Sequence, residues 1–320
     1  MKYFRLGKLR LSKICLGTWS LGGNKKNNFS YGNMNEKQTH KILDYAYQKG
    51  INFYDTANVY GDAEKRLGKF FKYERKKIFI ATKVGCTSFN KKLDFSFTTV
   101  NTQLKNSIRN LGNNYLDLVQ LYNPNPSDKK VHRIFKFLDK MKNYGLIKFI
   151  GVSLKSPEDY LKIRKFYNFD TVQCNFNILD HRALNQGIIK TIKSDGAKLF
   201  FRTVLNFGIF TNEFLKKKHI NFRKDDHRAR WDKNQIILWK KYAKRINSKI
   251  NQPIENISYK FSNSFNPEST IIGATKLKHI DIAMKLLDKK LLKVTKKEIF
   301  KNYTQFSKEN FTSRKIQMKL

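Results

Sequence analysis

Three side chains that could share one proton-transfer task lie at the ends of two apolar runs. Asp55 is near the end of residues 51–56, Tyr60 follows shortly after, and Lys83 is near the end of residues 77–84. A carboxylate beside a lysine keeps that lysine charged, and an ammonium beside a phenol lowers the pKa of the phenol. Such a phenol can give a proton to a carbonyl oxygen while hydride arrives from a cofactor. A buried Asp–Lys ion pair with a packed tyrosine would show the same spacing.

Further polar side chains occur where later apolar runs end. Tyr122 ends one run, Ser153 and Gln173 lie in the next two, and Arg202 and Thr203 lie towards the end of a fourth. In a barrel of parallel strands the carboxyl ends meet on one rim, and catalytic groups come from several strand ends there. The sequence therefore predicts that an acid, two phenols, an ammonium and several amide or hydroxyl groups converge on one rim.

The elements that would position these residues form a regular alternation. Short apolar, β-rich runs occupy residues 14–16, 51–56, 77–84, 116–122, 148–154, 171–176, 198–205 and 269–273. Helical patterns occupy residues 35–49, 62–71, 98–110, 131–144, 156–166, 184–193, 253–262 and 277–287. Near-continuous apolar runs are typical of parallel strands that helices cover on the outside. The alternation predicts an α/β fold, a closed (β/α)8 TIM barrel. No linker divides the chain, so we expect one domain over residues 1–320.

Three segments fall outside the alternation. Residues 1–13 read as a β-hairpin, which could close the bottom of a barrel. Residues 206–232 follow the seventh run and are basic, aromatic and irregular, as in a long functional loop. Residues 289–320 are rich in lysine and weakly periodic, which suits an extra C-terminal helix or a mobile tail.

Composition limits the class of protein. The chain has 320 residues, 65 Lys and Arg against 25 Asp and Glu, and a net charge of +40. No apolar run is long enough to cross a membrane, and the N-terminus lacks the apolar core of a secretory signal, so we expect a cytoplasmic protein. The three cysteines, Cys15, Cys86 and Cys174, have no metal-ligand spacing and are expected to be buried thiols.

The positive charge has two interpretations. It could serve an anionic partner such as nucleic acid, an acidic membrane surface or a phosphorylated substrate. It could also reflect composition alone, because the lysines spread along the whole chain and Asn, Ile, Phe and Tyr are abundant with them. We favour composition, since no recognition motif or discrete basic patch is visible. We expect no specific nucleic acid, no membrane partner, and a monomer or weak homo-oligomer.

Several motifs resemble one enzyme family. Residues 50–64, which contain Asp55 and Tyr60, closely resemble the signature around the catalytic Asp and Tyr of the aldo-keto reductases. Other segments resemble that family in the same order, from about residue 5 to 290; they are residues 16–19, 80–83, 116–121, 151–153, 172–173, 226–228 and 272–274.

The resemblance implies hydride transfer from NADPH, with NADH as the alternative, to a carbonyl without a metal. Tyr60 would be the general acid, Lys83 would assist it, and Asp55 would orient Lys83. Ser153 and Gln173 would hold the nicotinamide carboxamide. The residues implied in cofactor binding are Thr18, Trp19, Asp55, Ser153, Gln173, Arg202, Thr203, Gly273 and Lys276. The substrate would be an aldehyde or ketone of a small polar metabolite, with a sugar derivative as one candidate.

Two positions depart from the family pattern. Tyr122 stands where the family usually has a catalytic histidine, and a phenol there can still donate a hydrogen bond to the substrate oxygen. After the eighth run, His279, Ile282 and Ala283 replace polar residues that usually meet adenine, while Lys276 and Lys278 could meet a 2′-phosphate. These departures leave an alternative function open, a non-catalytic binding or regulatory barrel.

Overall fold

The computed structural model describes residues 1–24, 30–287, 289 and 291–309. Eight parallel strands close into a barrel in the order β10-β3-β4-β5-β6-β7-β8-β9. The strands are β3 (Ile14–Gly17), β4 (Phe53–Asp55), β5 (Phe79–Val84), β6 (Leu116–Tyr122), β7 (Ile147–Ser153), β8 (Thr171–Asn175), β9 (Lys198–Arg202) and β10 (Ser269–Gly273). The predicted (β/α)8 barrel is therefore confirmed, and each of the eight predicted runs contains one strand or nearly all of it.

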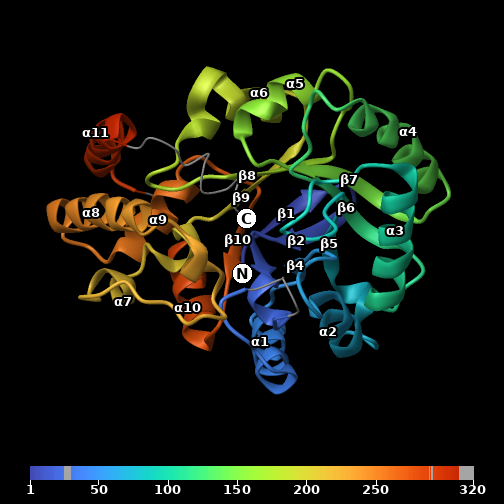
Figure 1. The fold of residues 1–320 in the computed structure, drawn as a ribbon, viewed down its shortest axis with the longest axis horizontal. Helices are drawn as coiled ribbons and strands as arrows, with labels where there is room; N and C mark the ends of the chain where they lie inside the picture. Colours follow the sequence, from blue (N-terminus) through green and yellow to red (C-terminus); the bar gives the residue numbers. More distant parts are fainter. Residues whose placement is uncertain (25–29, 288, 290, 310–320) are drawn as a thin grey trace.

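Helices surround the barrel (Figure 1). They are α1 (Glu36–Gln48), α2 (Ala63–Phe70), α3 (Phe97–Leu111), α4 (Lys129–Asn143), α5 (Tyr160–Ile163), α6 (Ile188–Ser194), α7 (Asn212–Leu215), α8 (Lys233–Ile250), α9 (Ile254–Asn263), α10 (Leu277–Leu286) and α11 (Lys293–Glu309). Within the part of the chain that the structure describes, no helix is both long enough and apolar enough to span a bilayer.

Side chains alternate between the two faces of each strand. On β6, Val119 and Leu121 belong to the large cluster that packs under the helices, whereas Leu118 belongs to a smaller cluster inside the barrel. Rings from β4 and β9, which are not neighbouring strands, meet across that interior, since the centroids of Phe53 and Phe200 lie 5.2 Å apart. The period of two then places Asp55, two residues after Phe53, in the next interior layer.

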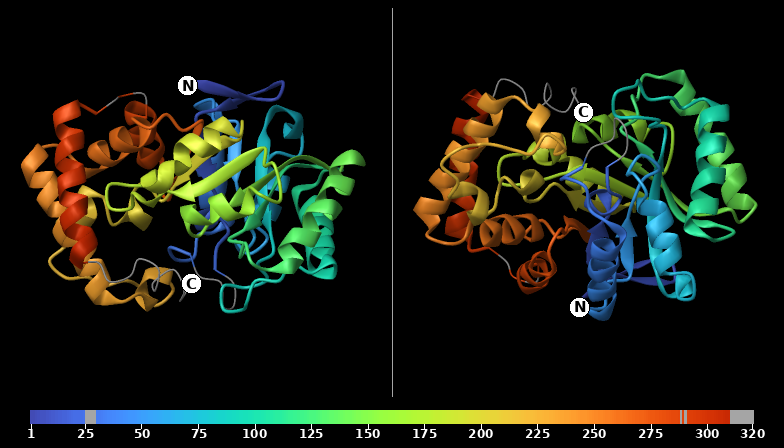
Figure 2. Two further views of the ribbon diagram at one scale, coloured as in Figure 1. Left: turned by 90° about the horizontal axis from the view of Figure 1, so that it is seen from above. Right: turned by 60° about the horizontal axis from the view of Figure 1, so that its bottom comes forward.

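The N-terminal hairpin closes one end of the barrel, as predicted. It consists of β1 (Tyr3–Leu6) and β2 (Leu9–Ser12), paired antiparallel. The Phe4 ring lies 5.8 Å from that of Phe200 and 6.3 Å from that of Phe53, at the amino ends of the strands. The hairpin stands at one end of the barrel in the left view of Figure 2. The polar residues of interest are therefore left at the opposite end.

The run predicted over residues 198–205 stops early. Strand β9 ends at Arg202, because Thr203 adopts a left-handed backbone with φ of 59°. A β-branched residue in that conformation is uncommon and ends the regular strand. The turn brings the following segment, residues 206–232, back over the mouth of the barrel.

The long segment and the C-terminal region take the forms expected. Residues 206–232 are mostly irregular and contain only α7 and short 3-10 turns. Helix α11 packs on α8, with the Phe306 ring 5.4 Å from that of Tyr242. The remainder of the predicted C-terminal segment, residues 310–320, lies outside the described residues.

Candidate active site

An ion pair lies at the carboxyl end of the barrel interior. Lys83 Nζ on β5 is 2.6 Å from Asp55 Oδ1 on β4 and donates a second hydrogen bond, of 2.8 Å, to the Thr56 carbonyl. Both side chains are almost fully buried, Lys83 at 1% and Asp55 at 5% exposed. The two residues share this layer because each follows an inward-facing residue of its strand by two positions.

Amides complete the shell around Asp55. Gln173 Nε2 donates to Asp55 Oδ2 at 2.8 Å, and Gln120 Nε2 donates to the same oxygen at 3.2 Å. Ser153 Oγ donates in turn to Gln173 Oε1 at 3.0 Å. The carboxylate is thus fixed by four strands of the barrel, and its orientation does not depend on Lys83 alone.

Gln120 was missed as a site residue from the sequence. A signal was present, because Gln120 is a polar residue inside an apolar strand and lies two positions from both Leu118 and Tyr122. Gly151 on the neighbouring strand β7 is paired with Gln120. A Cβ added to residue 151 would lie 3.3 Å from the Gln120 side chain and 2.1 Å from Thr171 Oγ1. The missing side chain at residue 151 therefore leaves room for the amide.

Two phenols lie above the ion pair. Lys83 Nζ is 5.0 Å from the centre of the Tyr60 ring, and Tyr122 ends the neighbouring strand β6. A hydrogen bond from the Tyr122 hydroxyl favours the phenolate form of Tyr60 and so lowers its pKa. The structure thus brings Asp55, Tyr60, Lys83 and Tyr122 together on one rim.

The expectation that Tyr60 titrates nearer neutral pH is wrong for this structure. Burial raises the pKa of Tyr60 well above its usual value, and the Asp55 carboxylate raises it further. The positive charge of Arg202 and the Tyr122 hydrogen bond oppose this rise without cancelling it. Tyr60 is therefore a protonated phenol at neutral pH, which is the state that a proton donor needs.

Arg202 is a cation whose charge acts on both phenols. Its charge lowers the pKa of Tyr60 and that of Tyr122, although burial raises both overall. Its Nη2 donates to the Leu154 carbonyl at 2.9 Å and lies 3.5 Å from Asn123 Oδ1. Arg202 starts from β9 and so crosses β8 to reach the ends of β7 and β6.

A cavity of about 1380 Å³ opens above these residues. Aromatic rings form one wall, with the Trp19 ring 6.1 Å from that of Tyr60 and 5.8 Å from that of Phe89. The cavity extends from Asp55, Tyr60 and Gln173 to Lys276 and Ile282. It is larger than the 300–1,000 Å³ usual for small-ligand pockets, so both a dinucleotide and a substrate can fit.

The other end of the cavity is basic. Lys276 and Lys278 lie beside it with His279 and Ile282, and both lysines face Glu213 of α7, at 3.6 and 3.5 Å. The attraction of these lysines lowers the pKa of Glu213. Ala283 is wholly buried in the packing of α10 and does not line the cavity, so its apolar character says nothing about adenine.

The remaining predicted cofactor residues occupy two kinds of position. Trp19, Gly273 and Thr203 line the cavity. Thr18 and Ser153 are fully buried instead. Thr18 Oγ1 donates to the Asp55 carbonyl at 3.0 Å, and Ser153 meets only Gln173 among its described side-chain partners. These two residues support the site from beneath.

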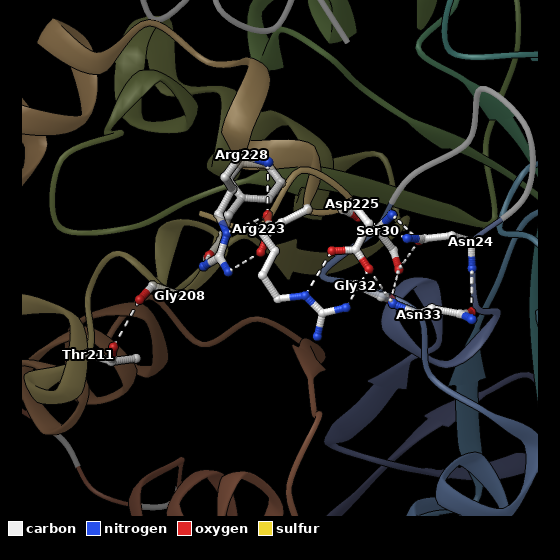
Figure 3. A network of polar contacts seen from close by, with 11 residues as sticks. Asn24, Ser30, Gly32, Asn33, Gly208, Thr211, Arg223, Asp225 and Arg228 are labelled. Carbon is white, nitrogen blue, oxygen red and sulfur yellow. Dashed lines mark hydrogen bonds and ion pairs between the residues drawn. The ribbon is translucent and has the colours of Figure 1, made fainter. Parts of the chain in front are cut away.

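The segment 206–232 is fastened across the cavity. Arg223 pairs with Asp225 at 2.6 Å, and Asp225 accepts from the backbone of Asn33 at 3.3 Å (Figure 3). Asn24 donates to the Asp225 carbonyl at 2.8 Å. His227 packs on Trp19 with ring centroids 4.4 Å apart. Residues 24 and 33, which follow β3, are therefore linked to the long segment after β9 beside the cavity.

Comparison with known proteins identifies the family. The family model described as the aldo/keto reductase family matches residues 13–300. The chain belongs to the aldo/keto reductase family. The aldo-keto reductase YhdN of Bacillus subtilis (strain 168) is 26% identical over 245 residues, 75% of this chain and 71% of the relative. The NADH-specific methylglyoxal reductase of Escherichia coli (strain K12) is 25% identical over 235 residues, 68% and 71% of the two chains.

Solved structures show the same fold. A glycerol dehydrogenase from Gluconobacter oxydans matches with a TM-score of 0.77 at 21% identity, over 98% of both chains. The holo form of an aldo-keto reductase from Bacillus halodurans matches with a TM-score of 0.74 at 23% identity, over 94% of this chain and 96% of that one. This aldo/keto reductase is accordingly an oxidoreductase that uses a nicotinamide cofactor.

The residues on the cavity wall fit such a cofactor. Lysines suit its phosphates at the end marked by Lys276 and Lys278. At the other end Gln173 offers a buried amide beside Asp55, under the cavity floor. The cavity thus has basic side chains at one end and a polar amide at the other, which suits an elongated ligand that carries phosphates and a carboxamide.

Proposed function

We propose that this aldo/keto reductase reduces the aldehyde or ketone of a small polar metabolite, with Tyr60 as general acid. The observation that carries the proposal is the arrangement of Lys83 between a buried Asp55, at 2.6 Å, and the Tyr60 ring, at 5.0 Å. NADPH or NADH supplies the hydride when it is bound.

The protein residues handle the proton. Tyr60 is protonated at neutral pH and gives its proton to the carbonyl oxygen of the substrate. The guanidinium of Arg202 and the hydroxyl of Tyr122 favour the resulting phenolate, and the ammonium of Lys83 lies 5.0 Å from the centre of its ring. Asp55 holds Lys83 in place and is itself held by Gln173 and Gln120.

Tyr122 has a second task in this proposal. Tyr122 lines the same cavity as Tyr60 and packs against the same small apolar cluster, so a carbonyl oxygen at the Tyr60 hydroxyl would lie near it. We assign to Tyr122 the hydrogen bond that orients the substrate oxygen, which a histidine usually makes in the family. A phenol is a neutral donor throughout the physiological pH range, so this bond does not depend on pH there.

NADPH is the cofactor we propose, with NADH as the less favoured nucleotide. Lys276 and Lys278 offer two positive charges at one end of the cavity, where a 2′-phosphate could sit. Glu213 faces both lysines. A phosphate bound at this end must therefore displace the Glu213 carboxylate or share the two lysines with it. The preference is therefore a balance between two lysines and one carboxylate.

Titration and assay of the purified protein test the proposal. NADPH and NADH are titrated separately while the fluorescence of tryptophan is followed, because Trp19 lines the cavity. Cofactor oxidation is then measured with methylglyoxal and glyceraldehyde. Saturable quenching followed by turnover supports the proposal. Quenching without turnover of any carbonyl favours a non-catalytic binding barrel, and absence of both from a folded protein contradicts the cofactor site itself.

A further inference from the structure

The cations around the cavity fall into two groups. Lys83, Arg223 and Arg228 each pair with a neighbouring carboxylate within hydrogen-bond distance, and Lys276 and Lys278 face Glu213. Most of the remaining cavity lysines are exposed to solvent; they are Lys91, Lys92 and Lys217. Two cavity cations are partly buried and have no carboxylate partner among the described residues, and these are Lys155 and Arg202.

Arg202 is fixed but not neutralised. Its described hydrogen-bond partners, the Leu154 carbonyl and Asn123 Oδ1, are both neutral and both contact Nη2. Nε is buried without a described partner, and Nη1 has none either. A buried cation without a counter-charge is costly. Such a cation in a cavity wall is typical of a site whose counter-charge arrives with a ligand.

Lys155 lies next to the same point of the fold. It follows Leu154, whose carbonyl accepts the Arg202 hydrogen bond, and its side chain lines the same cavity. Burial lowers the pKa of Lys155, and no carboxylate among the described residues opposes this shift. The two cations therefore flank one peptide unit at the carboxyl end of β7.

Arg202 and Lys155 lie too far along the cavity wall to bind the end of the cofactor that Lys276 and Lys278 would bind. Leu154 directly follows Ser153, which hydrogen-bonds Gln173 beneath the catalytic rim. Arg202 Nη2 lies 3.5 Å from Asn123 Oδ1, and Asn123 directly follows Tyr122 of that rim. The phosphate-binding lysines, Lys276 and Lys278, belong instead to the region after β10. An anion at Arg202 is thus close to the reacting carbonyl.

Resting on the function proposed above, we propose that the preferred substrate is a 2-oxo acid, whose carboxylate binds Arg202 with Lys155 beside it. Arg202 Nη2 contacts Asn123 and Leu154, which directly follow the paired residues Tyr122 and Ser153, so an anionic group on Arg202 lies beside the strand end that carries Tyr122 and is next to the carbonyl in the substrate. A planar carboxylate matches the planar guanidinium. The carbonyl carbon accepts hydride from NAD(P)H and its oxygen accepts the Tyr60 proton, giving a 2-hydroxy acid and NAD(P)⁺. Solvent returns the proton to Tyr60.

A charge-matched pair of substrates tests this assignment. Pyruvate and methyl pyruvate carry the same ketone, and only pyruvate is an anion. We expect Arg202→Gln to lower kcat/KM about 10- to 100-fold more for pyruvate than for the ester, which is the usual worth of a charge-assisted hydrogen bond. Arg202→Lys should recover part of the loss, and Lys155→Met should lower the same ratio less. Lys91→Met, which changes an exposed lysine of the same cavity, should leave the ratio unchanged.

Binding gives an independent reading. Oxamate, an unreactive analogue of pyruvate, should quench tryptophan fluorescence of the wild-type protein with NADPH present and should bind more weakly to Arg202→Gln. Equal losses for pyruvate and its ester, with oxamate affinity unchanged, would overturn the carboxylate site and assign Arg202 to the phenols alone. If the ester is reduced and pyruvate is not preferred, the proposed reduction stands and this inference fails. If neither is reduced but oxamate binds through Arg202, the proposed reduction fails and the anion site stands.

Discussion

Lys83 Nζ lies 2.6 Å from Asp55 Oδ1, deep in the barrel and beside the amides of Gln120 and Gln173. A buried ion pair of this kind contributes little net stability when both partners are present, but the loss of one partner leaves an uncompensated charge. Loss of Asp55 should therefore affect both the stability of the protein and its catalysis. The buried ion pair of Asp117 and Arg75, elsewhere in the barrel, provides a control that separates these two effects.

Asp55→Asn should destabilise the protein and also abolish most turnover per folded molecule. We expect a loss of about 3–5 kcal/mol in the free energy of unfolding, because Lys83 would be left buried and unpaired. The control is Asp117→Asn, which breaks the buried ion pair with Arg75, 2.5 Å long, at the amino end of β6. Denaturant unfolding and kcat are measured on both. A similar loss of kcat in the control would show that Asp55 acts only through stability.

Activity should not report an ionising Tyr60 between pH 6 and 9. Burial and Asp55 raise the pKa of Tyr60 above its ordinary value of about 10, so the proton donor stays in its protonated form across this range. The profile of kcat against pH is measured with a neutral carbonyl substrate. Any fall in kcat between pH 6 and 9 should remain when Tyr60 is replaced, because Tyr60 does not ionise in this range. A group titrating near pH 7 that Tyr122→Phe leaves in place and Tyr60→Phe removes would contradict the raised pKa.

Tyr122→Phe should lower kcat about tenfold or more while cofactor affinity stays unchanged. The variant removes the hydroxyl that we assign to the hydrogen bond with the substrate oxygen. A loss of this size is expected for one hydrogen bond that strengthens during the reaction. Tyr122→His restores a donor at the same strand end and should recover part of the rate. Equal rates for the wild type and Tyr122→Phe would rule out the hydrogen bond.

Glu213→Gln should shift cofactor preference towards NADPH. The carboxylate now pairs with Lys276 and Lys278, and its removal frees both lysines for a 2′-phosphate. Because all three side chains are exposed, we expect only a few-fold tighter binding of NADPH, with little change for NADH. Fluorescence titration measures both dissociation constants. Tighter binding of both nucleotides to the same degree would show that Glu213 repels the shared pyrophosphate instead.

Stability should fall in mild acid through a buried histidine. Burial lowers the pKa of His181 to about 3, although Asp180 opposes the shift. The ring is stacked 3.9 Å from Tyr303 of α11 and 5.0 Å from Phe261. The unfolded chain takes up a proton at its ordinary pKa near 6.5, so the stability is complete above that pH and is lost as the pH falls towards 3.

The size of this effect follows from the shift. Between pH 6.5 and 5 the free energy of unfolding should fall by about 1.6 kcal/mol on account of His181 alone. His181→Phe keeps an aromatic ring in the stack and should make stability less sensitive to pH by that amount, as urea unfolding at the two pH values would measure. An identical dependence in the variant would show that another group, such as the buried His227, carries the whole effect.

The strands could be predicted because they are continuously apolar and end in polar residues. Residues 116–122 and 269–273 were predicted to the residue, since their boundaries coincide with changes in side-chain type. The end of β9 was not predicted, because it depends on the left-handed backbone of Thr203. Threonine rarely adopts that conformation, so the sequence does not indicate it.

Most residues of the site, though not Gln120, were predictable from the sequence, whereas its electrostatics were not. Asp55, Tyr60, Lys83 and Tyr122 do meet on one rim. The sign of the Tyr60 pKa shift was missed because the sequence shows which charges are near but not how completely the phenol is removed from water. The reach of Arg202 across β8 was also invisible, since it depends on a side-chain path over the barrel mouth.

The central claim is that Tyr60 gives the proton in a nicotinamide-dependent reduction, and Tyr60→Phe tests it most directly. The wild type and the variant are compared by kcat with methylglyoxal and NADPH, and by the dissociation constant of NADPH from tryptophan quenching. Loss of a general acid should lower kcat by about 10²–10⁴-fold, while NADPH affinity stays within about twofold. A variant that reduces the carbonyl at the wild-type rate would contradict the assignment.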